Sequence, residues 1–271
     1  MEPFYYSKMD RPRQAAYRAI LTGLNSLEPS FLVPRMEGGE LYDIFFQLRL
    51  DHPEIFWASG FSWKYYPDSP NVIFVPEYLF DKAKIRDHQK AMRARIEKLA
   101  RPAKELTEWE KEKYIHDFIC ENIRYDKLKK PYSHEIIGPL GQGVGVCEGI
   151  AKSVKALCDE LGIWCMIALC GSNPEKGIKY RHTWNIVRIG GNYYHLDATF
   201  DNTLGKTRRS RVTTILIWMI RRYSGTMSRS SLRRQRVRMG SIFIIRKKSC
   251  LLPKRKMSTN APVRRQKKES S

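Results

Sequence analysis

Three residues of the types that perform nucleophilic catalysis follow one another along the chain, at Cys147, His182 and Asp197. Cys147 comes after a glycine-rich segment and starts a predicted helix, where the positive end of the helix dipole lowers a thiol pKa and favours the thiolate. A nearby imidazole can take and return the proton, and a carboxylate can hold that imidazole in place. A free cysteine alone is most often a small core residue. The prediction of a thiol nucleophile therefore depends on the three residues meeting.

A two-stranded hairpin is predicted around the histidine and the aspartate. The runs 182–189 and 192–200 have strand length, and Gly190 and Gly191 join them. A Gly-Gly pair suits a type I′ turn, because both of its central positions need a positive φ. In such a turn Ile189 pairs with Asn192.

That register has a consequence for the side chains. His182 faces Thr199 and Trp184 faces Asp197, so that His182 and Asp197 become diagonal neighbours on one face. Diagonal neighbours lie roughly 7 Å apart at the backbone, within side-chain reach. The imidazole and the carboxylate are then expected to form a hydrogen bond. The alternative is a buried structural histidine satisfied by a local carboxylate.

Other elements are predicted from hydrophobic periodicity and from turn residues. The helix that starts at Cys147 is predicted to run to Leu161 and to end at Gly162. A loop is predicted over 138–145. Gly143, Gly145 and Gly149 around Cys147 are expected to leave room for the backbone to approach a substrate. The remaining predictions are helices over 17–27, 41–50 and 81–125 with a break at Pro102, and strands over 61–66, 71–75 and 164–170.

Five short stretches carry a family resemblance: Gly145-Val146-Cys147-Glu148-Gly149, His182-Thr183-Trp184-Asn185, His195-Leu196-Asp197-Ala198-Thr199, Tyr114-Ile115-His116-Asp117-Phe118-Ile119 and Tyr125-Asp126. Together they resemble the transglutaminase-like (papain-like thiol) superfamily, and within it the bacterial transglutaminase-like domain proteins. The order Cys, His, Asp and the spacings of 35 and 15 residues suit the core of that family. The resemblance covers about residues 85–205.

The resemblance implies an α+β fold in which a helix carrying the nucleophile packs on an antiparallel sheet, after a helical N-terminal region. It implies that Cys147 is the nucleophile, His182 the general base and acid, and Asp197 the residue that orients His182. The backbone N–H of Cys147 would form part of an oxyanion hole, with Gln142 and Trp184 as the candidates for oxyanion or substrate contacts. The implied substrate is a peptide or protein amide, hydrolysed in preference to cross-linked, with no cofactor.

The sequence disfavours a nucleotide site, a metal site, a membrane span and secretion. Gly141-x-Gly143-x-Gly145 lacks the Gly-Lys-Ser/Thr ending of a phosphate-binding loop, so we expect no nucleotide site. The cysteines lack the paired spacing of a zinc site or a disulfide framework, which fits a reducing cytoplasm and predicts no metal. No apolar run reaches the ~18 residues needed to span a membrane. The segment 1–10 lacks the pattern of a secretory signal.

Charge divides the chain into a nearly neutral part and a basic tail. The net charge is +21, and residues 206–271 hold 21 Lys/Arg against one Glu. We expect an N-terminal region of helices and short strands over 1–84, a catalytic core over 85–205, and an unpacked tail over 206–271. A catalytically silent peptide-binding module, or a nucleic-acid binder acting through the tail, is the alternative to an enzyme.

The tail has two explanations. One is a disordered basic arm. The other is a frameshift near residues 201–211, because the codons of Trp218, Met219 and the start of Ile220 read TGG-ATG-AT, which in another frame contains GAT-GAT, or Asp-Asp. Over 212–220, allowed codons in that frame permit Tyr-Asp-Tyr-Phe-Asn-Leu-Asp-Asp, with only the Asp-Asp forced. This reading resembles the tyrosine- and aspartate-rich segment that follows the catalytic Asp in bacterial members of the family.

Overall fold

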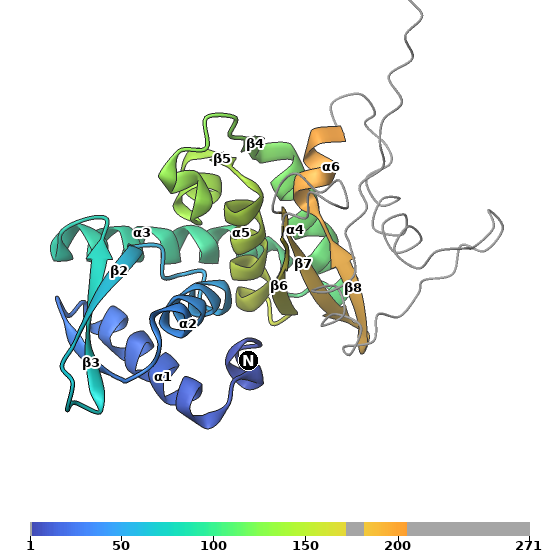
Figure 1. The fold of residues 1–271 in the computed structure, drawn as a ribbon. Coiled ribbons are helices and arrows are strands. Elements are labelled where there is room, and N and C mark those ends of the chain that lie inside the picture. Colours follow the sequence, from blue (N-terminus) through green and yellow to red (C-terminus); the bar gives the residue numbers. More distant parts are fainter. Residues whose placement is uncertain (1, 172–181, 205–271) are drawn as a thin grey trace, which may run out of the picture.

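The computed structural model describes residues 2–171 and 182–204, and Figure 1 shows their arrangement. The predicted basic tail over 206–271 therefore lies outside the described residues. The model is an α+β structure in which helices pack on antiparallel sheets, as the sequence predicts. No helix in the two described ranges is long and apolar enough to cross a membrane.

The N-terminal region combines two helices with a small sheet. Its elements are η1 (Tyr6–Lys8), α1 (Arg11–Ser26), β1 (Phe31–Pro34), α2 (Gly38–Asp51), β2 (Ala58–Tyr65) and β3 (Asn71–Tyr78). The sheet is antiparallel in the order β1-β3-β2, and Phe31 lies opposite Phe74. Helix α1 begins earlier than the periodicity predicts, because Asp10 accepts a hydrogen bond from the backbone N–H of Arg13 at 3.0 Å and so caps the helix. Strand β1 was not predicted, since four residues carry too little pattern.

The middle of the chain is helical, with the break that Pro102 predicts. Its elements are α3 (Lys82–Ala100), η2 (Arg101–Ala103), α4 (Glu108–Asn122), β4 (Arg124–Tyr125), η3 (Pro131–His134), η4 (Ile137–Gln142) and β5 (Val144–Gly145). A capping box between Thr107 and Glu110 starts α4. The prediction of a plain loop over 138–145 is wrong in part, because η4 is a π-helical turn and β5 pairs in parallel with β4.

The last described elements are α5 (Cys147–Glu160), β6 (Trp164–Cys170), β7 (His182–Ile189), β8 (Asn192–Leu196) and α6 (Ala198–Leu204). Helix α5 ends as predicted: the N–H of Gly162 bonds to Asp159 and that of Ile163 to Cys158, and Gly162 has φ +74°. This is the Schellman pattern. Strands β6, β7 and β8 form an antiparallel sheet in that order.

Helix α5 is the centre of the structure. It packs on β6 and β7 on one side and on α3 and α4 on others (Figure 1). Its residues Ile150, Val154, Leu157 and Cys158 are buried in one hydrophobic cluster that extends from α1 to β8. Burial of such side chains is worth about 1.5–3 kcal/mol each, so the start of α5 is a rigid place for a reactive side chain.

Candidate active site

Cys147 is the first residue of α5 and is half-buried. The preceding residue, Val146, caps the helix without a side-chain hydrogen bond, so no cap side chain occupies the N–H groups of the first turn. The backbone N–H groups of Glu148 and Thr183 bond to the Cys147 sulfur. The thiol therefore sits where the helix end and two amides favour its anionic form.

The hairpin that carries the histidine has the predicted register. Ile189 lies opposite Asn192, and the pairing continues without a shift to Asn185 opposite Leu196. Gly190 and Gly191 have φ +54° and +75°, as a type I′ turn requires.

The predicted pairs at the open end of the hairpin are wrong, because β8 ends at Leu196. Thr199 lies in α6 and does not face His182 across a ladder. The reason is a helix cap: the Oδ1 atom of Asp197 accepts a hydrogen bond from the backbone N–H of Phe200 at 3.0 Å. Asp197 therefore caps α6, which begins at Ala198, and aspartate is among the best helix-capping residues.

His182 and Asp197 nevertheless meet. The Nε2 atom of His182 lies 2.6 Å from Oδ2 of Asp197, whose side chain is only 3% exposed. His182 also has a hydrogen bond with the Cys147 thiol. Because Asp197 occupies Nε2, the nitrogen left for the thiol is Nδ1. The three residues are thus joined in the order Cys147, His182, Asp197.

The electrostatics of the contact favour an ion pair of thiolate and imidazolium. Burial lowers the pKa of His182, but its bonds to Asp197 and Cys147 outweigh burial and raise the pKa to about 10. Burial raises the pKa of Cys147, but His182 and the two backbone N–H groups outweigh it, so that the pKa is lowered below its usual value. A thiol in this state is nucleophilic at neutral pH.

Trp184 is buried and supports the histidine ring. Its indole lies parallel to His182, with the ring centroids 5.9 Å apart, and its N–H donates to Nδ1 of His195 at 2.9 Å. Burial lowers the pKa of His195 to about 4, which keeps that imidazole neutral and able to accept the bond. The indole N–H of Trp184 is therefore already used inside the fold.

Gln142 is exposed at the end of η4, five residues before Cys147. The expectation that the glycines leave room for a substrate is wrong for two of them. A Cβ at Gly149 would lie 2.2 Å from the carbonyl oxygen of Ser133, and one at Gly145 would lie 2.5 Å from the ring of Pro139. The space at these glycines is filled by the chain itself.

A buried ionic network beneath the start of α5 was not predicted. Lys152, which has no exposed side-chain surface, lies 2.8 Å from Glu148 and 2.9 Å from Glu135. Arg49 also bonds to Glu135, and His134 to Glu148. Burial raises the pKa of Glu148, but Lys152 and His134 outweigh burial and hold it well below its usual range. The spacing of four residues between Glu148 and Lys152 indicates a helical ion pair in the sequence. The contacts with residues distant in the sequence have no such pattern.

Tyr125 is a second residue that sequence reasoning did not assign to the site. Strand β4 places Tyr125 opposite Gly145, two residues before the nucleophile. Burial and the charge of Cys147 raise the pKa of the Tyr125 phenol, which is still 37% exposed as a residue. The phenol is thus a protonated donor near the thiol. The Tyr125-Asp126 stretch of the family resemblance was its only signal.

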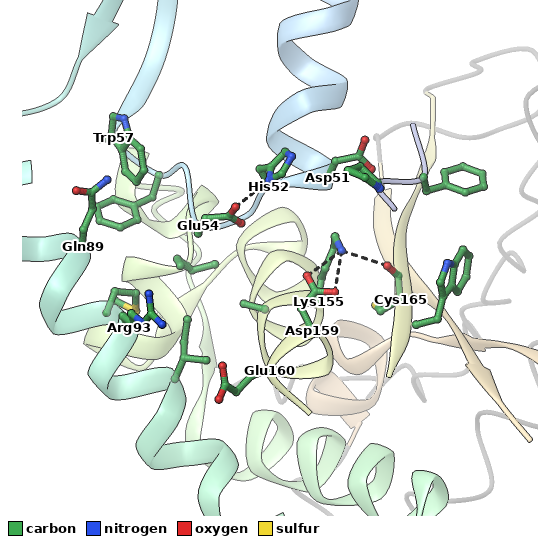
Figure 2. Close-up of a pocket in the computed structure, with 18 of the residues that line it drawn as sticks. Asp51, His52, Glu54, Trp57, Gln89, Arg93, Lys155, Asp159, Glu160 and Cys165 are labelled. Carbon is green, nitrogen blue, oxygen red and sulfur yellow. Dashed lines mark hydrogen bonds and ion pairs between the residues drawn. The ribbon is translucent and has the colours of Figure 1, made fainter. Parts of the chain in front are cut away.

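The structure also has a cavity of 610 Å³, and Figure 2 labels Lys155, Asp159 and Cys165 among the residues that line it. Its lining includes Lys155, Asp159 and Trp164, and Lys155 is bound to Asp159 at 2.8 Å and to the Cys165 carbonyl oxygen at 3.3 Å. Lys155 and Asp159 are eight and twelve residues after Cys147 in α5, which at 1.5 Å per residue is about 12–18 Å along the helix. The cavity is therefore separate from the candidate site around Cys147.

A family model matches part of this chain. Residues 93–198 match the family model of the transglutaminase-like superfamily, a stretch that contains Cys147, His182 and Asp197. This part of the chain is therefore similar to a transglutaminase-like core.

Two solved structures are also similar. The crystal structure of a TGase is 14% identical, with a TM-score of 0.34, over 57% of this chain and 46% of that chain. The crystal structure of a putative cysteine protease from Cytophaga hutchinsonii is 18% identical, with a TM-score of 0.33, over 52% of this chain and 61% of that chain. This chain thus spans between about half and three fifths of the length of those two chains. No curated protein matches it.

Proposed function

We propose that this chain is a thiol acyl-transfer enzyme that acts on amide or isopeptide bonds and delivers the acyl group to water. The observation that carries the proposal is the chain of contacts from the Cys147 thiol to His182 and from His182 to Asp197 at 2.6 Å. Nucleophile, base and orienting carboxylate are within hydrogen-bond reach of one another, as covalent catalysis requires.

In the acylation step the Cys147 sulfur attacks the carbonyl carbon of the substrate. The amide resonance is lost, and the π electrons of the carbonyl bond move to the oxygen atom, which becomes an oxyanion. The N–H of Cys147 at the start of α5 is the proposed donor to that oxyanion, with exposed Gln142 as a second candidate. When the carbon–nitrogen bond breaks, the Nδ1 proton of His182 goes to the leaving amine, and a thioester remains.

In the deacylation step a water molecule loses its proton to His182 as its oxygen attacks the thioester carbonyl. The carbon–sulfur bond breaks, Cys147 leaves as thiolate, and the carboxylic acid is released. Asp197 stabilises the imidazolium in both steps and is not itself protonated. An amine in place of water would give transfer rather than hydrolysis, so the two outcomes differ only in which nucleophile reaches the thioester.

The test uses p-nitrophenyl acetate, which acylates a reactive thiol and releases a coloured phenolate. We expect a burst of phenolate equal to the enzyme present, an acetyl group on Cys147 by mass spectrometry, and loss of both in Cys147→Ala. Cys120→Ser is the matched control, because Cys120 is also half-buried and lies 3.5 Å from a histidine, His116, but is not at a helix start. A burst that survives in Cys147→Ala would contradict the proposal.

The choice between water and amine is measured on the same acetyl-enzyme. We expect it to break down in buffer alone, and the addition of glycine methyl ester to change its rate of breakdown little. A breakdown that requires the amine, with the acetylated amine as product, would show that the enzyme is a transferase.

A further inference from the structure

Helix α6 starts at the residue that orients the candidate general base. Asp197 caps the helix, and one turn later the backbone N–H of Asp201 bonds to the Asp197 carbonyl oxygen at 3.2 Å. The position of the Asp197 carboxylate therefore depends on how α6 is held. The hairpin does not fix it alone, because β8 ends one residue earlier.

Asp201 is the buried contact through which α6 is held. Its side chain is 2% exposed, and its Oδ2 atom lies 2.9 Å from Nε2 of His116, whose side chain is 6% exposed. His116 belongs to α4, 85 residues earlier in the chain. Asn202 adds a second bond, from its side-chain amide to the carbonyl oxygen of Ile123 just after α4.

The contact pairs the His116 imidazole with the Asp201 carboxylate. Burial raises the pKa of Asp201, and the hydrogen bond to His116 opposes that rise. Burial lowers the pKa of His116, but the hydrogen bonds to Asp201 and Cys120 outweigh burial and raise the pKa to about 10, so the imidazole is charged at neutral pH. The other titratable groups near His116 among the described residues are Asp117, 3.5 Å from its Nδ1, and Glu112, one turn before it on α4, whose pKa burial raises to about 7. A buried ion pair is directional and costly to break, which makes it suited to fix one packing of two elements.

Helix α4 supports both halves of the candidate site. It packs against α5, which carries Cys147, and against α6, which Asp197 caps (Figure 1). The pair of His116 and Asp201 therefore links the helix of the orienting carboxylate to a helix that also contacts the helix of the nucleophile.

We propose that His116 and Asp201 are positioning residues, which hold α6 so that the Asp197 carboxylate stays on His182. This inference rests on the proposed function, since it concerns the same thiol. Neither residue touches the reacting atoms, and both act through Asp197.

The readout is the pH dependence of Cys147 alkylation by iodoacetamide, measured at a temperature well below the melting temperature. This profile reports the apparent pKa of the thiol. Asp201→Ala removes the tether, and we expect the apparent pKa of Cys147 to rise by roughly one unit because His182 loses part of its support. At pH values below that pKa, alkylation would be about tenfold slower. An unchanged profile in folded Asp201→Ala would overturn the proposal.

Asp201→Asn separates the tether from the charge. An amide at this position can still bond to His116, so we expect a profile within a few tenths of a unit of the wild type. A shift as large as that of Asp201→Ala would mean that the charge of Asp201 acts directly, and would also overturn positioning.

If Asp201→Ala does not fold, the double variant His116→Phe with Asp201→Leu tests the positioning role instead. Replacing both partners by apolar groups leaves no unpaired buried charge. The double variant should show the same rise in the Cys147 pKa, and a wild-type profile there would refute the idea. The control is Lys113→Gln, which removes only an exposed ion pair on α4. A wild-type protein without a depressed Cys147 pKa would instead refute the proposed function itself, and the positioning role with it.

Discussion

Asp197 binds His182 from the start of a helix, not from within a strand. One carboxylate oxygen lies 2.6 Å from Nε2 of His182, while the other accepts the backbone N–H of Phe200 at 3.0 Å. The cap fixes the carboxylate in space, so that it is already oriented when the imidazolium forms. The same side chain thus has a structural and an electrostatic role, and substitutions can separate them.

Asp197→Asn should keep the fold and lose most of the activity. Asparagine caps helices as well as aspartate, so we expect the variant to fold with α6 in place. The charge that favours the imidazolium is gone, and the rate of acylation by p-nitrophenyl acetate should fall by about 10³–10⁴-fold. Asp197→Ala also loses the cap and should cost about 1 kcal/mol of stability in addition. Full activity in Asp197→Asn would mean that the carboxylate is only a cap.

Cys147 should be the first cysteine to react with iodoacetamide near pH 6. Its pKa is lowered by His182 and by backbone N–H groups, against the effect of burial. The hydrogen bond with Cys165 and burial raise the pKa of Cys158, which should stay unlabelled. Peptide mapping by mass spectrometry measures the order, and uniform labelling of the cysteines would contradict it.

The rate at which an amide substrate acylates Cys147 should fall at high pH. His182 must be protonated to donate to a leaving amine, and it loses that proton as the pH rises through about 10. With an amide substrate we therefore expect a bell-shaped profile, rising through the lowered pKa of Cys147 and falling near pH 10. Replacing the amide by p-nitrophenyl acetate should weaken the alkaline fall, because a phenolate leaves without a proton.

Glu112 should make the protein less stable at neutral pH than in mild acid. Burial raises the pKa of this α4 side chain to about 7, and its Oε1 atom is buried with no hydrogen-bond partner among the described residues. A carboxyl with a raised pKa contributes its full stability below the unfolded value of about 4.5, and loses it as the pH rises through 7. Glu112→Gln removes this loss, worth on the order of 2 kcal/mol at pH 8.

The measurement is the difference in melting temperature between Glu112→Gln and the wild type at pH 5 and pH 8. The variant should gain several degrees relative to the wild type at the higher pH. The exposed Glu121→Gln on the same helix is the control and should show no such difference. An equal difference at both pH values would show that Glu112 is ionised in the fold.

The sequence predicts the parts of the site that local rules control. The Gly-Gly turn sets the hairpin register, because only one two-residue turn matches two positive φ values, and Gly162 marks the end of α5. The end of β8 was missed because the strand periodicity of the sequence continues past Asp197. In the structure the Asp197 side chain bonds to the backbone N–H of Phe200 and starts a helix, so the strand pairing does not continue.

The contacts beneath the site could not be predicted. Arg49 and Glu135 are 86 residues apart, and His116 and Asp201 are 85 residues apart. Neither pair has a local pattern, since each depends on how α2, α4 and α6 pack around α5. The division of the chain at residue 84 stays a prediction.

The basic segment over 206–271 lies outside the described residues, and its explanation is a question of nucleotide sequence. If a frameshift produced it, resequencing codons 200–215 should find a single-base insertion or deletion. Restoring the frame should raise both the melting temperature and the acylation rate of Cys147, because strands or helices native to the family would then follow α6. An intact frame, or no change in either quantity, would favour a genuine basic tail.

Gly149→Ala should damage the site through packing alone. Gly149 lies in the first turn of α5, and a Cβ there would meet the Ser133 carbonyl oxygen at 2.2 Å. That oxygen also accepts the N–H of Val146 at 3.0 Å, so it cannot move away without releasing the residue before Cys147. We expect a loss of about 1–3 kcal/mol and slower alkylation of Cys147, as the helix start shifts. Gly39→Ala in α2, where a Cβ meets nothing within 4 Å, is the matched control and should be neutral or slightly stabilising. Equal behaviour of the two alanine variants in thermal unfolding and in alkylation would show that the contact with Ser133 does not hold the nucleophile in place.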